Sequence, residues 1–275
     1  DFIYVTKSTD GGETWSEPTL LDVKKASEQS LLVGPGRGIV ISTGEHKGRI
    51  VFTCYEFTNG DKNSAAIYSD DNGVTWHRGA SAKNFSSEAV VTEADGKLYM
   101  FVRRENVYYV SNDGGETWSD PQAMGISYNA TCQLTATTYS EKINGKTAIF
   151  FACPSNTFSR AAGKIYVGLV QDDGSIDWAY DYSINGSAYY AYSCISENGV
   201  NTSIRYGTEA KKCNKTSAPN YTDEGYYPVY YEIEYTYGGE SMTENGVSYV
   251  WLLSDNPPSN TNSIHTHDFR FLETV

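Results

Sequence analysis

Glu88 and Arg103 form a pair whose residue types and spacing suit proton transfer and anion binding. Asp95-Gly96 is a strong two-residue turn signal, so residues 87–104 are expected to form a β-hairpin. Counted outward from the turn, Glu88 faces Arg103 on one side of the sheet, with Cβ atoms ~5 Å apart. Such a carboxylate can accept a proton and such a guanidinium can bind an anion. The alternative is an ion pair on an exposed edge, which contributes little; the apolar neighbours of both residues favour a functional role.

Tyrosine and two loop arginines supply further candidates by residue type alone. Residues 188–195 are expected to form an aromatic strand on which Tyr190 and Tyr192 share a face, and ordinary strand packing explains them equally well. Arg37 and Arg160 lie in expected loops. An arginine there can bind an anion, but a lone loop arginine is usually a surface residue.

An eight-residue repeat is the feature that must position these side chains. The pattern Ser-x-Asp-x-Gly-x-Thr-Trp occurs complete at residues 8–15, 69–76 and 111–118, and residues 171–178 keep only its Asp173 and Trp178. Each copy follows a β-rich run, so it is expected to be the turn of a hairpin. The tryptophans of the four copies lie 61, 42 and 60 residues apart, and a four-stranded blade takes roughly 40 to 50 residues. The spacing predicts a β-propeller, with a β-sandwich as the competing architecture.

Composition narrows the class of protein. The 275 residues suit one all-β domain, expected at residues 1–239, with a C-terminal extension of one strand and a loop at 240–275. The net charge of −13, without a basic cluster, argues against nucleic-acid binding. No apolar run reaches membrane-spanning length, and we expect no signal peptide within these residues.

Metal binding is not expected, and no cofactor is implied. The five cysteines are widely separated and form no Cys-x-x-Cys pair. His265 and His267 alternate in a polar tail, where two histidines are more often solvated than bound to a metal.

Several motifs in one order resemble the bacterial exo-α-sialidases. They are the three complete repeats, known in that family as Asp boxes, and then Gly-Pro-Gly-Arg-Gly-Ile, Ser-Glu-Ala-Val-Val with Met-Phe-Val-Arg, Cys-Gln-Leu, a Ser-Arg loop and Tyr-Tyr-Ala-Tyr-Ser-Cys. The resemblance covers residues 1 to about 237. It implies a six-bladed propeller that hydrolyses terminal sialic acids with retention, through a covalent tyrosyl intermediate.

The resemblance assigns four residues. Glu88 matches the catalytic glutamate, Tyr192 the nucleophile, and Arg103 and Arg160 two of three arginines that bind the substrate carboxylate. Sialylated glycans are the implied partners, and secretion or display at the cell surface is the implied location. Further carbohydrate-binding domains are possible in a full-length protein.

The sequence also departs from the family pattern. An Arg-Ile-Pro strand with the third arginine and an Asp acid before the first Asp box are both missing from the chain, which opens in the middle of a blade. We therefore expect the first strands of the propeller to be absent and this chain alone to be a poor hydrolase. A trans-sialidase, an intramolecular trans-sialidase and a non-catalytic glycan-binding propeller remain alternative functions.

Overall fold

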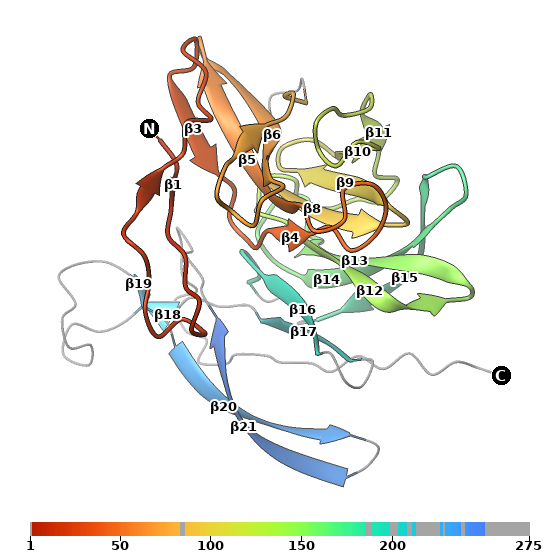
Figure 1. Ribbon diagram of the computed structural model, residues 1–275. Coiled ribbons are helices and arrows are strands. Elements are labelled where there is room, and N and C mark those ends of the chain that lie inside the picture. Colours follow the sequence, from red (N-terminus) through yellow and green to blue (C-terminus); the bar gives the residue numbers. More distant parts are fainter. Residues whose placement is uncertain are drawn as a thin grey trace.

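The computed structural model describes residues 2–82, 86–184, 187, 189–198, 203–207, 211–212, 226–227, 229–237 and 240–250, and all regular elements in these ranges are β-strands (Figure 1). The all-β fold expected from the sequence is therefore confirmed. Among these residues there is no helix long and apolar enough to cross a membrane. His265 and His267 lie outside the described ranges.

Three antiparallel sheets follow one another along the chain (Figure 1). The first contains β3 (Ser30–Val33), β4 (Ile39–Val40), β5 (Ile50–Thr58), β6 (Asp61–Ser69) and β7 (His77–Arg78). The second contains β8 (Ala89–Ala94), β9 (Lys97–Val102), β10 (Val107–Ser111) and β11 (Gln122–Ala123). The third contains β12 (Thr135–Ile143), β13 (Lys146–Pro154), β14 (Gly163–Val170) and β15 (Ile176–Ser183). In the second and third sheets each strand pairs with the next strand of the chain, and in the first sheet β3 and β4 both pair with β5.

Four strand pairs complete the described elements. They are β1 (Tyr4–Val5) with β2 (Thr19–Leu20), β16 (Cys194–Asn198) with β17 (Ser203–Gly207), β18 (Lys211–Lys212) with β19 (Tyr226–Tyr227), and β20 (Val229–Tyr237) with β21 (Glu240–Val250).

Each complete eight-residue repeat is a turn between two strands of one sheet, as the pattern predicted. In the third copy, between β10 and β11, Thr117 donates its backbone N–H and its hydroxyl to the Asp113 carboxylate, and Ser111 donates its hydroxyl to the same carboxylate. Gly114 and Gly115 take positive φ angles of 67° and 94°, which glycine adopts without strain. The first two copies repeat this network, so the pattern specifies a turn rather than a catalytic site.

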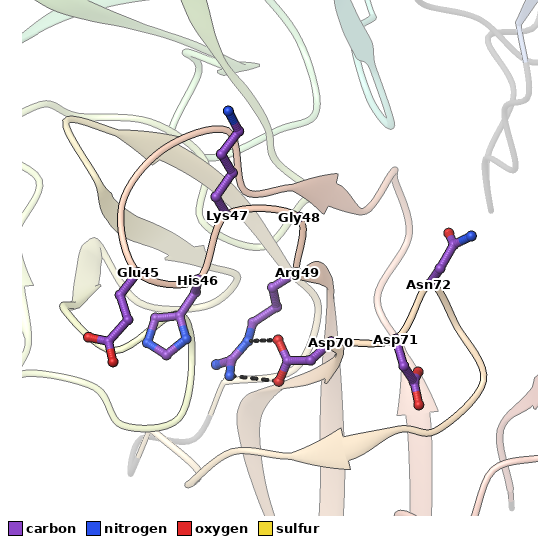
Figure 2. Close-up of a pocket in the computed structure, with 8 residues that line it drawn as sticks. All are labelled: Glu45, His46, Lys47, Gly48, Arg49, Asp70, Asp71 and Asn72. Atoms are coloured by element: carbon purple, nitrogen blue, oxygen red, sulfur yellow. Dashed lines mark hydrogen bonds and ion pairs between the residues drawn. The ribbon is translucent and has the colours of Figure 1, made fainter.

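Arg49 ties two of these turns together. Its buried guanidinium pairs with Asp70 at 2.8 and 2.9 Å (Figure 2). It also pairs with Glu116 at 3.0 Å, so it joins the second repeat to the third. It also lies 4.0 Å from the centroid of the Tyr68 ring. Because the two turns belong to successive blades, Arg49 fixes their spacing at the end of the sheets where the repeats lie.

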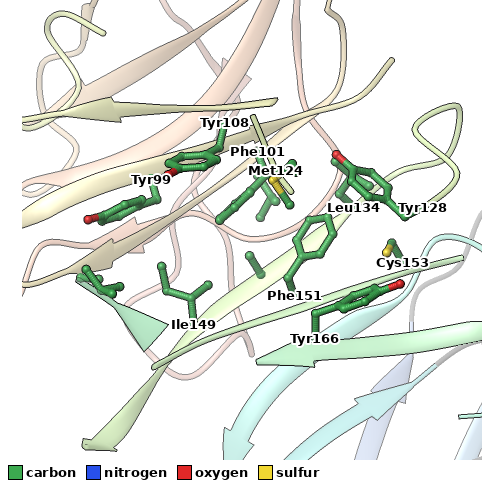
Figure 3. Close-up of a cluster of buried hydrophobic side chains, with 14 residues drawn as sticks. Tyr99, Phe101, Tyr108, Met124, Tyr128, Leu134, Ile149, Phe151, Cys153 and Tyr166 are labelled. Atoms are coloured by element: carbon green, nitrogen blue, oxygen red, sulfur yellow. The ribbon is translucent and has the colours of Figure 1, made fainter. Parts of the chain in front are cut away.

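Aromatic side chains fill the space between the second and third blades (Figure 3). Phe101 on β9 packs against Phe151 on β13 with 5.2 Å between ring centroids, and Tyr128 packs edge-on against Phe151 at the same separation. Close-packed rings of this size dominate the energy of a core. The two blades are thereby held at a fixed angle, and their loops at the other end of the sheets are held with them.

The first blade also contains a buried ionic cluster of Glu28, Glu56 and Arg78. Arg78 donates to both carboxylates, and the side chains of Arg78 and Glu28 are only 4% and 1% exposed. The remaining Glu28 oxygen accepts the Lys25 N–H at 2.9 Å. One cation therefore balances two carboxylates that are largely removed from water.

We predict that Arg78→Ala lowers the free energy of unfolding by about 3–5 kcal/mol, because two buried carboxylates lose their cation. Urea denaturation measures this change. Lys146→Ala is the control: it breaks the pair with Asp172, whose side chain is 97% exposed, and it should cost no more than about 1 kcal/mol. Equal losses for the two variants would contradict a stabilising role for the buried cluster.

Candidate active site

The β8–β9 hairpin places Glu88 and Arg103 opposite each other, as its turn predicted. Asp95 and Gly96 take φ angles of 50° and 75°, the left-handed pair that a tight hairpin turn requires. The strands pair in the expected register, and beyond their last partners the Arg103 N–H donates to the Glu88 carbonyl at 2.8 Å. The side chains meet as an ion pair, with 2.7 Å between Arg103 Nη1 and Glu88 Oε2. Each is only 16% exposed, which removes the exposed-edge alternative.

Tyr192 joins this pair from a distant part of the chain. Its hydroxyl donates to Glu88 Oε1 at 3.0 Å. The hydroxyl oxygen of Tyr192 also accepts a hydrogen bond from Arg103 Nη1 at 3.0 Å. Burial, together with the negative charge of Glu88, raises the pKa of Tyr192 to about 12. The phenol therefore keeps its proton at neutral pH, and that proton points at a carboxylate.

The backbone around Tyr192 differs from the expectation. Residues 188–195 were expected to form a strand with Tyr190 and Tyr192 on one face, but β16 begins only at Cys194 and Tyr192 takes a φ of 50°. This left-handed conformation is uncommon for a bulky side chain and interrupts the alternation of a strand. Tyr190 is fully buried in the core, whereas Tyr192 is half-buried at the site.

The segment at residues 129–133, in which Asn129, Cys132 and Gln133 are buried, holds this conformation. The Tyr192 N–H donates to the Cys132 thiol, and Gln133 Nε2 donates to the Ser193 carbonyl at 3.4 Å. The same segment fixes the arginine, because Arg103 Nε donates to the Thr131 carbonyl at 3.0 Å. Strained backbone persists only where surrounding contacts determine it, and such strain clusters at functional sites.

Arg160 completes the group of four. It lies in the loop between β13 and β14, with its guanidinium carbon 5.6 Å from the centroid of the Tyr192 ring. The Arg160 carbonyl accepts the Tyr190 N–H at 2.9 Å, so this loop and the segment before β16 run side by side. The structure therefore brings together all four site residues predicted from the sequence.

Strand direction explains why the site and the repeats do not overlap. Glu88 precedes β8, Arg103 follows β9, Arg160 lies between β13 and β14, and Tyr192 precedes β16. The second repeat begins where β6 ends, and the third repeat begins where β10 ends. Because the strands alternate in direction, the four side chains share one end of the sheets and the repeats occupy the other.

Tyr55, on β5 of the first blade, lies within the electrostatic reach of the Glu88–Arg103 pair, which the sequence did not reveal. Burial raises the pKa of its phenol, the charge of Glu88 raises it further and the charge of Arg103 lowers it, which places Tyr55 in the field of this pair. On β5 it is one of three aromatic residues, with Phe52 and Phe57, so its strand gave no signal. Arg37, in contrast, is exposed and donates to Thr137 Oγ1 at 2.6 Å, in agreement with its expected surface role.

Among the described residues, no group of three or more His, Cys, Asp or Glu side chains is arranged to hold an ion. The site instead combines one carboxylate, one phenol and two guanidinium groups, a set suited to proton transfer beside a bound anion.

Comparison with known proteins identifies the family. The model of the BNR repeat-like domain matches residues 1–200. The anhydrosialidase of Macrobdella decora is 36% identical over 219 residues, which are 72% of this chain and 28% of that protein. Sialidase B of Streptococcus pneumoniae is 34% identical over 209 residues, 72% of this chain and 29% of that protein.

Solved structures agree with these relatives. A leech intramolecular trans-sialidase superposes with a TM-score of 0.68 at 33% identity, over 75% of this chain and 32% of that chain. The intramolecular trans-sialidase of Ruminococcus gnavus gives a TM-score of 0.68 at 32% identity, over 75% of this chain and 45% of the other. The chain thus spans less than half the length of these relatives, and its sheets are blades of the sialidase propeller. It belongs to the sialidase family of BNR repeat-like proteins.

Proposed function

We propose that the protein is an exo-α-sialidase that removes terminal sialic acids from glycoconjugates with retention, through a covalent bond to Tyr192. The observation that carries the proposal is the position of the Tyr192 hydroxyl, which donates to Glu88 and accepts from Arg103 at 3.0 Å each. In the first step the Tyr192 oxygen attacks C2 of the sugar and its proton passes to Glu88, while the bond from C2 to the glycosidic oxygen breaks and that oxygen takes a proton from the Asp acid of the family pattern, which these 275 residues do not supply. Water then attacks C2 from the face opposite Tyr192 and gives a proton back to that acid, and Tyr192 takes its own proton back from Glu88.

The anionic substrate explains why a phenol is used. Sialic acid carries a carboxylate on the carbon that is attacked, so a carboxylate nucleophile would be repelled. A tyrosine approaches as a neutral group, and sialidases are an exception to the usual pair of catalytic carboxylates. The raised pKa of Tyr192 makes a base necessary, and Glu88 is in hydrogen-bond contact with the proton to be removed.

Arg103 and Arg160 are the proposed ligands of the substrate carboxylate. Guanidinium groups form charge-assisted and often bidentate hydrogen bonds with carboxylates, which lysine does not reproduce. Both arginines contact Tyr192 from different sides of the site, one at its hydroxyl and one over its ring. A carboxylate held by both would lie beside the attacking oxygen. The net charge of −13 opposes encounter with an anion, but nearby arginines dominate the field inside the site.

An intramolecular trans-sialidase is the second candidate. Two of the similar proteins are named as an anhydrosialidase and an intramolecular trans-sialidase, and one was solved with 2,7-anhydro-Neu5Ac. On the same residues, the sugar's own 7-hydroxyl would attack C2 in place of water and displace Tyr192. Analysis of the released sugar distinguishes the two reactions, because hydrolysis gives free sialic acid and the transfer gives its 2,7-anhydro form. Either reaction fits a secreted or cell-surface enzyme, which is the location we propose.

Two features of the family pattern bear on whether these 275 residues are active alone. The chain has no match to the family's Arg-Ile-Pro arginine or its Asp acid, so we expect it to hydrolyse sialosides poorly or not at all by itself. A version preceded by a segment with both features should be active. Release of the leaving group from an activated aryl sialoside measures both proteins. A normal enzymatic rate for the 275 residues alone would show that neither feature is needed.

In the active version, Tyr192→Phe should abolish turnover without loss of the fold, because the variant removes only the attacking oxygen. The rate with the aryl sialoside and the melting temperature by circular dichroism test the two halves of this statement. Tyr189→Phe is the control and should retain activity. Tyr189 lies three residues earlier and pairs through its backbone with Ala161, in the loop that carries Arg160. An unchanged rate in Tyr192→Phe would remove this residue from the mechanism.

Glu88→Gln should lower the rate about 10²- to 10⁴-fold at pH 7 and give it a new pH dependence. Without the base, attack requires tyrosinate, whose fraction rises about tenfold per pH unit below the pKa of Tyr192. Loss of the neighbouring negative charge also brings that pKa below its value of about 12 in the unaltered protein. The variant should therefore regain activity between pH 7 and 10. A flat profile in Glu88→Gln would show that Glu88 does not accept the tyrosine proton.

A further inference from the structure

Phe158 is an exposed aromatic ring with no role in the core. Its side chain is 98% exposed, the highest value among the exposed large apolar residues in the described part of the chain. The next is Val74 at 77%, in the turn of the second repeat. A solitary exposed apolar residue is ordinary on a protein surface, so the position of Phe158 and the rigidity of its loop decide whether it has a function.

The loop that carries Phe158 is fixed by its own hydrogen bonds. The Asn156 side-chain oxygen accepts the N–H groups of Phe158 and Ser159 at 3.0 and 3.2 Å. At the base of the loop, Ser155 donates its N–H and its hydroxyl to the Ala162 carbonyl at 2.9 and 2.7 Å. The fold therefore holds the ring in water on a structured turn, rather than on a loose segment.

The same loop carries Arg160, so the ring lies at the rim of the proposed site. Two residues of extended chain span at most ~7 Å, which limits the distance between the Cα atoms of Phe158 and Arg160. Arg160 is anchored to Tyr190 through its carbonyl, and its guanidinium lies over the Tyr192 ring. Phe158 consequently stands at the end of the sheets where Glu88, Arg103 and Tyr192 meet.

We propose that Phe158 is a stacking platform for the sugar to which the sialic acid is attached. The inference rests on the proposed function and extends it from the sialic acid to the rest of the substrate. An exo-acting site holds the terminal sugar against Tyr192, and the following sugar must leave past the rim. The C–H groups on the face of a pyranose are apolar and pack against an aromatic ring, and burying this surface of Phe158 favours binding.

Two features of the platform affect specificity. The loop is ordered before the substrate arrives, so little conformational entropy is lost when a sugar binds. Phenylalanine offers no hydrogen bond, so it recognises the shape of a sugar face and not the pattern of its hydroxyl groups. The platform should therefore accept different glycans that end in sialic acid, while favouring them over the isolated monosaccharide.

Binding by the full chain tests the proposal. Titrations followed by NMR would give the Kd for 3′-sialyllactose, which has a following sugar, and for N-acetylneuraminic acid, which has none. Phe158→Ala should weaken binding of 3′-sialyllactose about tenfold and leave the Kd for N-acetylneuraminic acid unchanged. Phe158→Trp should restore the preference, since it keeps an aromatic face. Val74→Ala, an exposed apolar residue at the opposite end of the sheets, is the matched control and should change neither constant.

The outcomes separate this inference from the proposed function. If Phe158→Ala binds both compounds like the unaltered chain, the platform is overturned and the proposed site stands. A tenfold loss for both compounds equally also overturns it, because that result reports a displaced Arg160 and not a lost stacking surface. If neither the unaltered chain nor the version preceded by the segment with the third arginine binds either compound, the proposed function fails, and the platform fails with it.

Discussion

The site depends on one hydrogen bond, from the Tyr192 hydroxyl to Glu88. It joins residues that are 104 positions apart in the sequence, and it gives each partner its chemical character. The carboxylate and the partly buried surroundings keep the phenol protonated, and the phenol in turn presents its proton to Glu88. Arg103 contacts both partners and balances the charge of the carboxylate. Any change in the relative position of the second blade and the segment before β16 would break this arrangement.

The rest of the described structure keeps these two parts in position. Arg49 and the repeat turns fix the blades at one end of the sheets, and the aromatic layer around Phe101 and Phe151 fixes them along their length. At the other end, the segment at residues 129–133 contacts both Arg103 and Tyr192. The Asp boxes thus have a structural role, and chemistry is left to loops that a rigid scaffold positions.

Local rules predicted the parts of the site that local structure determines. The Asp-Gly turn allows only one register, so it paired Glu88 with Arg103. The repeat of Asp, Gly, Thr and Trp has a specific network of hydrogen bonds, so its turns could be predicted. The distance between the copies then predicted the blades. The left-handed backbone at Tyr192 was not, because it is imposed by Cys132 and Gln133, about 60 residues earlier. Tyr55 was missed for the same reason: its strand pattern is ordinary, and only the neighbouring blade gives it a charged environment.

The most direct test of the account is to trap the covalent intermediate. A 2,3-difluoro sialic acid carries fluoride at C2, which leaves without an acid, and fluorine at C3, which slows the release of the sugar from the enzyme. Mass spectrometry of peptides after incubation should find one sugar attached to the oxygen of Tyr192. A sugar attached to Glu88 or to another side chain, with Tyr192 unmodified, would contradict the central claim that this phenol is the nucleophile.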